Sequence, residues 1–210
     1  MPSANADSDR SEATIPVKCA ACEGLRQVPF ACDDCHELLA HVQGADYFEL
    51  FGLPRRYDLD PNDLESKYLA ISSNIHPDRF AVSGPEMQAF ALRASAAVNS
   101  AYNVLRHPIH RAEYLLESAG GPSAAQDRTV PPALLSEVMT FREDIEAAKA
   151  SGNQAELAAL RRRLEDRRDL IQQEVSALCE NINDLNDERR RRLREQLNAV
   201  KYVNNLLGHL

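Results

Sequence analysis

Four cysteines near the N-terminus have the spacing of a metal site. Cys19 and Cys22 form one CxxC pair, Cys32 and Cys35 form another, and nine residues separate the two pairs. Each short CxxC turn can point two sulfurs at one ion, and four thiolates complete a closed tetrahedral shell. Zinc is the default occupant of such a shell, although a single iron ion also suits four sulfur ligands. The pattern predicts a structural metal-binding module over residues 15–40.

Two other uses of these cysteines compete with the metal site, a pair of disulfides and a redox-active CxxC. Disulfides are disfavoured in a reducing cytoplasm, and a redox motif has no reason to be doubled. The segment has few large apolar side chains, so we expect it to depend on the metal in order to fold. Its role is open between stability, pairing of two chains into a homodimer, and contact with another partner. The fifth cysteine, Cys179, is expected to be a free thiol among the C-terminal helices.

A second candidate for chemistry is the tripeptide His76-Pro77-Asp78, which lies between two stretches with helical apolar spacing, residues 61–75 and 85–105. Proline lacks an amide proton and disfavours helix at the residue before it, so the first helix must end at the tripeptide. The two helices can then fold back as a hairpin with the tripeptide exposed at the turn. An imidazole and a carboxylate on a rigid turn form a good recognition element, because little conformational entropy is lost when such a turn docks. The alternative is a turn that only ends a helix.

The elements that position these residues are predicted to be almost entirely α-helical, because apolar residues recur mainly at helical spacing. Residues 1–14 are expected to form a disordered leader, and residues 46–119 a compact helical domain. Residues 120–130 read as a linker, since they begin with two glycines and a proline and stay small and polar. Residues 131–210 show three long one-sided stripes, which predict a three-helix bundle.

The first bundle helix carries more apolar residues than its core needs. Leu134, Val138, Phe141 and Ile145 already belong to the inward stripe, whereas Leu135 and Met139 lie about 100° around the helix, where water is expected. Such a pair outside the core stripe is either a partner-binding patch or a broad core face.

Composition limits the function classes. A hydrophobic content of 44% can build packed cores, and a net charge of −8 argues against a general nucleic-acid binder. No stretch is long and apolar enough to cross a bilayer, and the N-terminus lacks the apolar core of a secretory signal. We expect a cytoplasmic protein, or an organellar one if a presequence has been removed.

Four runs of sequence resemble the HscB family, the J-domain co-chaperones of iron–sulfur cluster assembly. The runs are Asp46-Tyr47-Phe48-Glu49-Leu50-Phe51-Gly52-Leu53-Pro54, His76-Pro77-Asp78-Arg79-Phe80, Asn99-Ser100-Ala101-Tyr102, and Leu105-Arg106-His107-Pro108 followed by Arg111-Ala112-Glu113-Tyr114-Leu115-Leu116. The resemblance covers about residues 46–210, and some relatives, including animal ones, carry a similar N-terminal cysteine module. It implies a J domain joined to a C-terminal three-helix bundle.

The resemblance also implies partners and site residues. The J domain would stimulate the ATPase of a DnaK/HscA-type chaperone, and the bundle would bring it an IscU-type scaffold. The implied chaperone-binding residues are His76, Pro77, Asp78, Arg79, Lys67 and Tyr68. The implied scaffold-binding residues are Leu135, Met139 and Tyr202. J domains usually dock through a basic helix, yet residues 61–75 offer only Lys67 against two acids, so electrostatic steering should be weak.

Two alternative functions compete with this one. A nucleic-acid-binding or protein-binding adaptor, unrelated to iron–sulfur assembly, would use the cysteine module and the arginine runs at 161–163, 167–168 and 189–192. Those arginines alternate with acids and lack an aromatic stacking platform, which is typical of a solvated helix face. A hydrolytic enzyme would need a nucleophile in an elbow motif or an open metal position, and the sequence offers neither. We therefore expect a protein without an active site.

Overall fold

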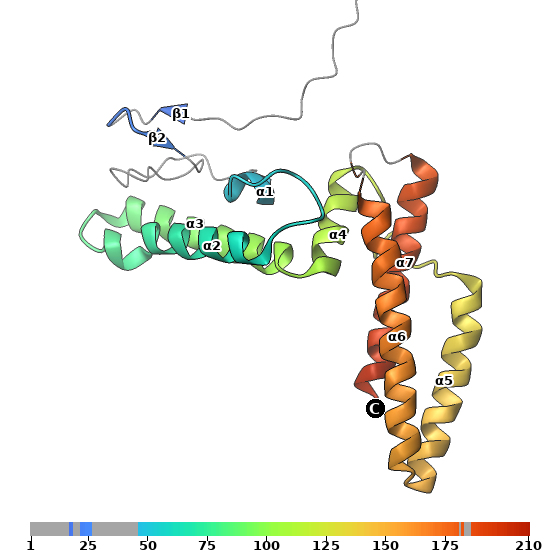
Figure 1. Cartoon of the computed structure of the whole chain (residues 1–210). Helices are drawn as coiled ribbons and strands as arrows, with labels where there is room; N and C mark the ends of the chain where they lie inside the picture. The colour runs from blue at the N-terminus through green and yellow to red at the C-terminus, as the bar shows by residue number, and fades with distance from the viewer. Residues whose placement is uncertain (1–16, 19–21, 27–45, 181, 183–185) are drawn as a thin grey trace, which may run out of the picture. The chain divides into compact units, whose positions relative to one another are not determined.

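The computed structural model describes residues 17–18, 22–26, 46–180, 182 and 186–210, and the predicted all-α fold is confirmed (Figure 1). The predicted leader, residues 1–14, lies outside the described residues. The helices are α1 Tyr47–Leu50, α2 Pro61–Asn74, the 3-10 turn η1 Pro77–Phe80, α3 Pro85–Leu105, α4 Pro108–Ser118, α5 Pro132–Ser151, α6 Gln154–Cys179 and α7 Asp187–Gly208. In the part of the chain that is described, no helix is both long enough and apolar enough to cross a membrane.

Two short strands were not predicted from the sequence. β1 (Val17–Lys18) and β2 (Leu25–Arg26) pair antiparallel, with Val17 opposite Arg26 and Lys18 opposite Leu25. Glu23, between the strands, has a left-handed backbone with φ of 59°. A positive φ at a residue other than glycine is typical of a tight turn. The connection between β1 and β2 contains Cys19 and Cys22, the first predicted CxxC pair.

The chain divides into two compact units. The first contains, among the described residues, those up to Arg55 and the segment Asp60–Leu105, and the second contains Arg56–Leu59 and Arg106–Leu210. The J domain predicted over residues 46–119 thus extends past this division, because α4 packs against α7 within the second unit.

The first unit is a helical hairpin of α2 and α3, with α1 packed on α3 (Figure 1). α2 begins where the sequence predicts, because the Asp60 side chain accepts a hydrogen bond from the Asn62 amide and Pro61 fills the first helical position. Its buried residues, Leu64 and Ile71, face α3, which contributes mainly alanines and Val98 to the core. Small side chains on α3 allow the two helices to approach closely.

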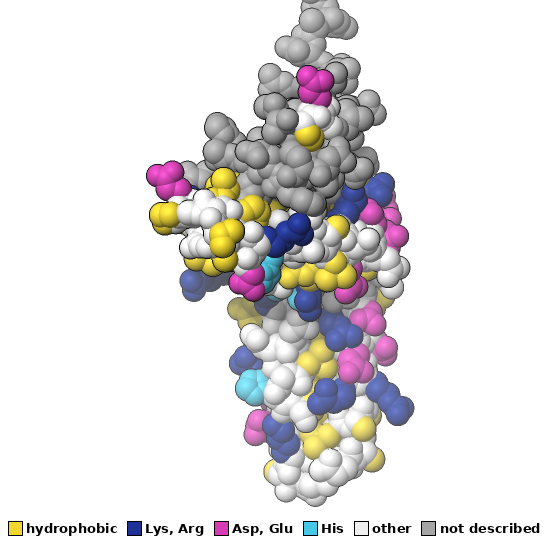
Figure 2. All heavy atoms as spheres, turned by 90° about the vertical axis from the view of Figure 1, so that its left-hand side faces the viewer, with side chains coloured by type: hydrophobic (Ala, Val, Ile, Leu, Met, Phe, Trp, Pro, Cys, Tyr) yellow, Lys and Arg dark blue, Asp and Glu magenta, His cyan; other side chains and the backbone are white. Residues whose placement is uncertain are grey.

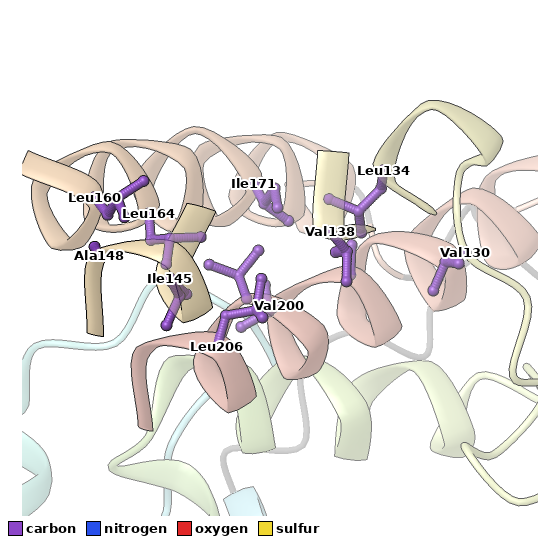
Figure 3. Packing of buried hydrophobic residues seen from close by; sticks show 12 residues of the cluster. Val130, Leu134, Val138, Ile145, Ala148, Leu160, Leu164, Ile171, Val200 and Leu206 are labelled. Atoms are coloured by element: carbon purple, nitrogen blue, oxygen red, sulfur yellow. The ribbon is translucent and has the colours of Figure 1, made fainter. Parts of the chain in front are cut away.

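The second unit is built on the predicted three-helix bundle of α5, α6 and α7. Figure 3 shows its apolar side chains converging between the three helices. α5 ends at Gly152, whose φ of 66° is left-handed, and the next residue, Asn153, caps α6 by accepting a hydrogen bond from the Glu156 amide. Asn186 caps α7 by accepting from the Arg189 amide. The buried residues of this core are Val130, Leu134, Val138, Ile145, Ala148, Leu160, Leu164, Ile171, Ala199, Val200, Val203 and Leu206.

Leu178 and Leu207, near the C-terminal ends of α6 and α7, are only half-buried, whereas their neighbours Cys179 and Leu206 are buried. α6 packs on α4 as well as on α5 and α7. Cys179 lies near enough to Arg111 of α4 for the guanidinium to act on the pKa of its thiol.

The predicted linker is an ordered loop in the second unit. The amide of Gly121 bonds the Leu116 carbonyl at 2.9 Å, and a side chain at Gly121 would collide with Leu116, so only glycine fits there. Farther along, the Asn198 side-chain amide of α7 donates to the carbonyl oxygens of Asp127 and Thr129, at 3.0 and 2.9 Å. The loop thus lies against α7 rather than hanging free.

Candidate functional site

The His76-Pro77-Asp78 turn is exposed at the end of the α2–α3 hairpin, as predicted. His76 caps the short turn η1: its Nδ1 accepts a hydrogen bond from the Asp78 amide at 3.3 Å, and its carbonyl accepts from the Arg79 amide at 3.0 Å. Because Nδ1 is an acceptor, the neutral ring carries its proton on Nε2. The Asp78 carboxylate, 3.5 Å from Nδ1, is 91% exposed. The turn therefore presents an N–H donor and a carboxylate to an incoming protein.

α3 holds this turn at both of its ends. The Ser95 hydroxyl donates to the carbonyl of Ile75, directly before the turn, at 3.2 Å. The Gln88 side-chain amide donates to the carbonyl of Ala81, directly after η1, at 2.6 Å. Ser95 and Gln88 were missed by the sequence reasoning, although their spacing of seven residues on one helix face was a usable signal. Through these two bonds α3 orders the backbone on either side of the turn.

Three further residues that the resemblance assigned to the chaperone contact lie on α2 and the turn. Arg79 donates from Nη1 to the Ser73 carbonyl at 3.4 Å, so its side chain folds back over the end of α2. Lys67 is partly exposed on α2. The Tyr68 ring stacks on the Tyr102 ring, with centroids 4.0 Å apart, which places it between the two helices of the hairpin.

The residues assigned to scaffold binding are exposed on two bundle helices. Leu135 and Met139 of α5 are 48% and 65% exposed, and Tyr202 of α7 is 37% exposed. α5 packs directly on α7. Large apolar side chains left in water on two adjoining helices are a candidate protein-binding surface.

The opposite side of α5 is occupied by α6. Arg167 donates from Nε to Glu137 at 2.9 Å, Arg163 lies 3.8 Å from Asp144, and the Arg163 guanidinium sits over the Phe141 ring at 4.9 Å. These contacts use the α5 residues that face α6. Leu135 and Met139 lie outside that contact.

Four of the nine arginines in the runs at 161–163, 167–168 and 189–192 form ion pairs with acids. Besides Arg163 and Arg167, Arg168 pairs with Asp169 at 3.0 Å and Arg190 pairs with Asp187 at 2.9 Å. On the bundle face drawn in the lower part of Figure 2, basic and acidic side chains alternate. A surface of this kind does not offer the continuous positive charge that binds phosphates.

A buried ion pair joins α4 to α7. Arg194, fully buried, donates to Glu113 at 2.9 Å, and Lys201 lies 2.6 Å from the same carboxylate oxygen. Burial alone would raise the pKa of Glu113, but the hydrogen bonds from Lys201 and Arg194 outweigh it and hold the pKa below its usual value. This cluster could not be predicted from local patterns, because Glu113 and Arg194 lie 81 residues apart.

Of the predicted metal ligands only Cys22 is described, and it is exposed. Cys19, Cys32 and Cys35 lie outside the described residues. Within the described residues, no three His, Cys, Asp or Glu side chains are grouped so that they could hold a metal ion. Cys179 is a buried free thiol, as expected, and burial raises its pKa to about 12. A thiol with such a pKa is inert near neutral pH.

Comparisons with known proteins agree on one family. Residues 130–210 match the family described as "HSCB C-terminal oligomerisation domain". The Co-chaperone protein HscB homolog of Bordetella pertussis is 39% identical over 140 residues, which are 66% of this chain and 81% of that protein. The homolog of Burkholderia thailandensis is 42% identical over 123 residues, covering 58% and 70% of the two chains.

Two solved structures are similar along most of their length. Chaperone HscB from Vibrio cholerae has a TM-score of 0.67 at 28% identity, covering 78% of this chain and 94% of that one. The human co-chaperone protein HscB has a TM-score of 0.74 at 25% identity, covering 91% of this chain and 95% of that one. These structures have the same fold as this chain over the regions they cover.

Proposed function

Because the chain belongs to the HscB family of J-domain co-chaperones, we propose that it stimulates the ATPase of a DnaK/HscA-type chaperone and delivers an IscU-type iron–sulfur scaffold to it. The His76-Pro77-Asp78 turn is the element that engages the chaperone. Leu135, Met139 and Tyr202 bind the scaffold. The family's co-chaperones are not enzymes, and this chain acts on the ATPase of another protein.

The observation that carries the chaperone half of this proposal is the exposed, pre-ordered turn. Its backbone is held from α3 by Ser95 and Gln88, while the His76 ring and the Asp78 carboxylate remain accessible. A rigid recognition element loses little conformational entropy on docking. When the turn contacts the ATP-bound chaperone, it favours hydrolysis only if it binds the chaperone's hydrolysis-competent state more tightly than its other states.

The second half of the proposal is that one chain binds both partners. When the bundle holds the scaffold and the turn engages the chaperone, the scaffold meets the chaperone's peptide site at a high effective concentration. Hydrolysis then locks the scaffold in place, and cluster release to a recipient follows. Neither step requires this chain to bind the cluster itself.

Charge on the docking helix limits the chaperone affinity. α2 contains Asp63 and Glu65 against Lys67, and Arg79 is the one base within η1. Attraction toward an acidic chaperone surface should therefore be weak and only slightly sensitive to salt. The relatives from Bordetella and Burkholderia are bacterial proteins, and the chaperone needs ATP. Both points favour the cytoplasm as the compartment of this protein.

The N-terminal cysteines supply a separate proposal, a structural zinc site made by Cys19, Cys22, Cys32 and Cys35. In its support, the β1–β2 pairing brings the two ends of the segment with the first CxxC together, and a left-handed Glu23 follows Cys22. Two paired strands joined by a segment that contains a CxxC suit two thiolates of a tetrahedral site. Such a metal would order the module and take no part in the ATPase.

The proposed delivery can be tested by capture of the scaffold on the chaperone. Immobilised DnaK/HscA-type chaperone is given ATP and an IscU-type scaffold, with or without this protein, and retained scaffold is measured after washing. The proposal predicts more retained scaffold when the protein is present, and a loss of the gain for Tyr202→Ala. Equal retention with and without the protein would reject the delivery role.

A further inference from the structure

α7 carries a polar strip, defined as Arg194, Asn198 and Lys201, on one side of the helix. The spacing of four and three residues places the three side chains above one another. All three reach segments that precede the bundle: Arg194 and Lys201 bind Glu113 of α4, and Asn198 binds the loop between α4 and α5. The strip therefore connects α7 to the chain that leads into α5.

Asn198 is buried, with 5% of its surface exposed, and its side-chain amide nitrogen donates two hydrogen bonds. That nitrogen has two protons, and they go to the carbonyl oxygens of Asp127 and Thr129. The loop supports the same geometry, because the Thr129 amide bonds the Asp127 carboxylate at 2.8 Å. Two carbonyls two residues apart are thus fixed to one point of α7.

The fixed loop leads directly into the candidate scaffold surface. Val130, the residue after Thr129, is buried in the bundle core, and α5 begins at Pro132. Leu135 is exposed in the first turn and a half of that helix. On α7, Tyr202 lies one turn after Asn198. The Asn198 side chain therefore fixes the segment that leads into α5, and it lies one helical turn before Tyr202 on α7.

From this arrangement we infer that Asn198 is a positioning residue for the scaffold-binding surface, which sets the place of Leu135 and Met139 relative to Tyr202. The inference rests on the proposed scaffold binding. A surface shared by two helices binds well only when its anchors are held at the right separation by supporting hydrogen bonds. Asn198 supplies that support without touching the scaffold.

The test uses Asn198→Asp in the full chain, because the carboxylate keeps the shape of the side chain but has no proton to donate. Asn205→Asp, at an exposed position of the same helix, makes the same charge change and serves as the control. Three quantities are measured for each protein: the Kd for an IscU-type scaffold, the thermal midpoint, and chaperone ATPase stimulation without scaffold.

We expect Asn198→Asp to raise the scaffold Kd about tenfold at a temperature where the protein is fully folded, with stimulation in the absence of scaffold unchanged. Asn205→Asp should leave the Kd within about twofold of the wild type. The loss should also be non-additive with Tyr202→Ala, since a misplaced surface gains less from the tyrosine. A purely structural residue would lower the thermal midpoint and leave the Kd of the folded protein unchanged.

An unchanged Kd for Asn198→Asp, in a protein whose Tyr202→Ala variant binds weakly, would overturn this inference and leave the proposed function standing. If the wild type itself does not bind the scaffold, the proposed function fails first. Should Asn198→Asp not fold, Asn198→Ala removes the same donors without adding a charge, and the same two outcomes for the Kd decide.

Discussion

The rings of Tyr68 and Tyr102 are stacked, with centroids 4.0 Å apart and planes 11° from parallel, and the Tyr68 hydroxyl donates to Asn99 Oδ1 at 2.9 Å. Tyr68 therefore contributes to the packing of α2 on α3, in addition to any contact that it makes with the chaperone. Its two roles can be separated by substitution.

Tyr68→Phe keeps the stack and removes only an exposed hydrogen bond, so it should cost less than about 1 kcal/mol of unfolding free energy. Tyr68→Ala also removes the ring and should cost about 2–4 kcal/mol. Urea denaturation measures both, and ATPase stimulation of a DnaK/HscA-type chaperone is measured below the unfolding range. We expect Tyr68→Phe to stimulate like the wild type. A large loss of stimulation by stable Tyr68→Phe would instead place its hydroxyl in the chaperone contact.

The buried carboxylate of Glu113 should make the second unit sensitive to acid. Its folded-state pKa lies below the ordinary value of 4.5, so its carboxylate stabilises the fold above that pH, and the contribution is lost as the pH falls through the lower folded-state pKa. Glu113→Gln leaves Arg194 buried beside a neutral group and should cost about 3 kcal/mol at pH 7.

The measurement is urea denaturation of wild type and Glu113→Gln at pH 7 and at pH 3.5. The difference in unfolding free energy should be large at pH 7 and smaller at pH 3.5. Glu117→Gln, exposed on the same helix, is the control and should follow the wild type at both values. A Glu113→Gln difference that stays constant with pH would contradict the assigned stabilisation.

The exposed residue Met139 should contribute to scaffold binding and little to stability. We expect Met139→Ala to weaken the scaffold Kd about tenfold, in the range of an interface anchor, while changing the unfolding free energy by less than about 1 kcal/mol. Leu170→Ala is the matched control, because Leu170 is a similarly exposed apolar residue, 55% exposed, on α6. Calorimetric titration of the scaffold measures both. Equal scaffold Kd values for Met139→Ala and Leu170→Ala would show that Met139 is not part of a scaffold-binding surface.

Metal removal should affect only the cysteine module. We expect one zinc per chain by elemental analysis, and its loss in Cys19→Ser or Cys32→Ser, because a structural site needs all four thiolates. Cys179→Ser, at a cysteine outside the module, should keep the metal. Sedimentation of the same proteins tests whether the module pairs two chains. Full zinc content in the Cys32→Ser protein would refute the four-cysteine site.

The fold was largely predictable because its signals are local. Pro77 marked the end of the first hairpin helix, and helical apolar spacing predicted α2, α3 and the three bundle helices. Helical periodicity placed Leu135 and Met139 outside the core stripe, but it left a broad core face as an alternative to exposure. Each of these needs only a few neighbouring residues, which a single sequence contains.

What could not be predicted depends on contacts between distant segments. The Arg194–Glu113 ion pair and the Asn198 bonds to the loop at Asp127 and Thr129 join residues about seventy to eighty positions apart. Nothing in the local pattern pairs them, since a buried arginine reads as a surface charge on a polar helix. The placement of α4 against α7 was missed for the same reason.

The central claim, chaperone stimulation by the turn, is tested most directly by the steady-state ATPase rate of a DnaK/HscA-type chaperone with wild type, His76→Gln and His107→Gln. His107 is also an exposed histidine, but it lies outside the turn, at the start of α4. We predict stimulation by wild type and by His107→Gln, a further increase when an IscU-type scaffold is added, and loss of stimulation for His76→Gln. Stimulation that survives in His76→Gln, or that is absent for the wild type, would contradict the account.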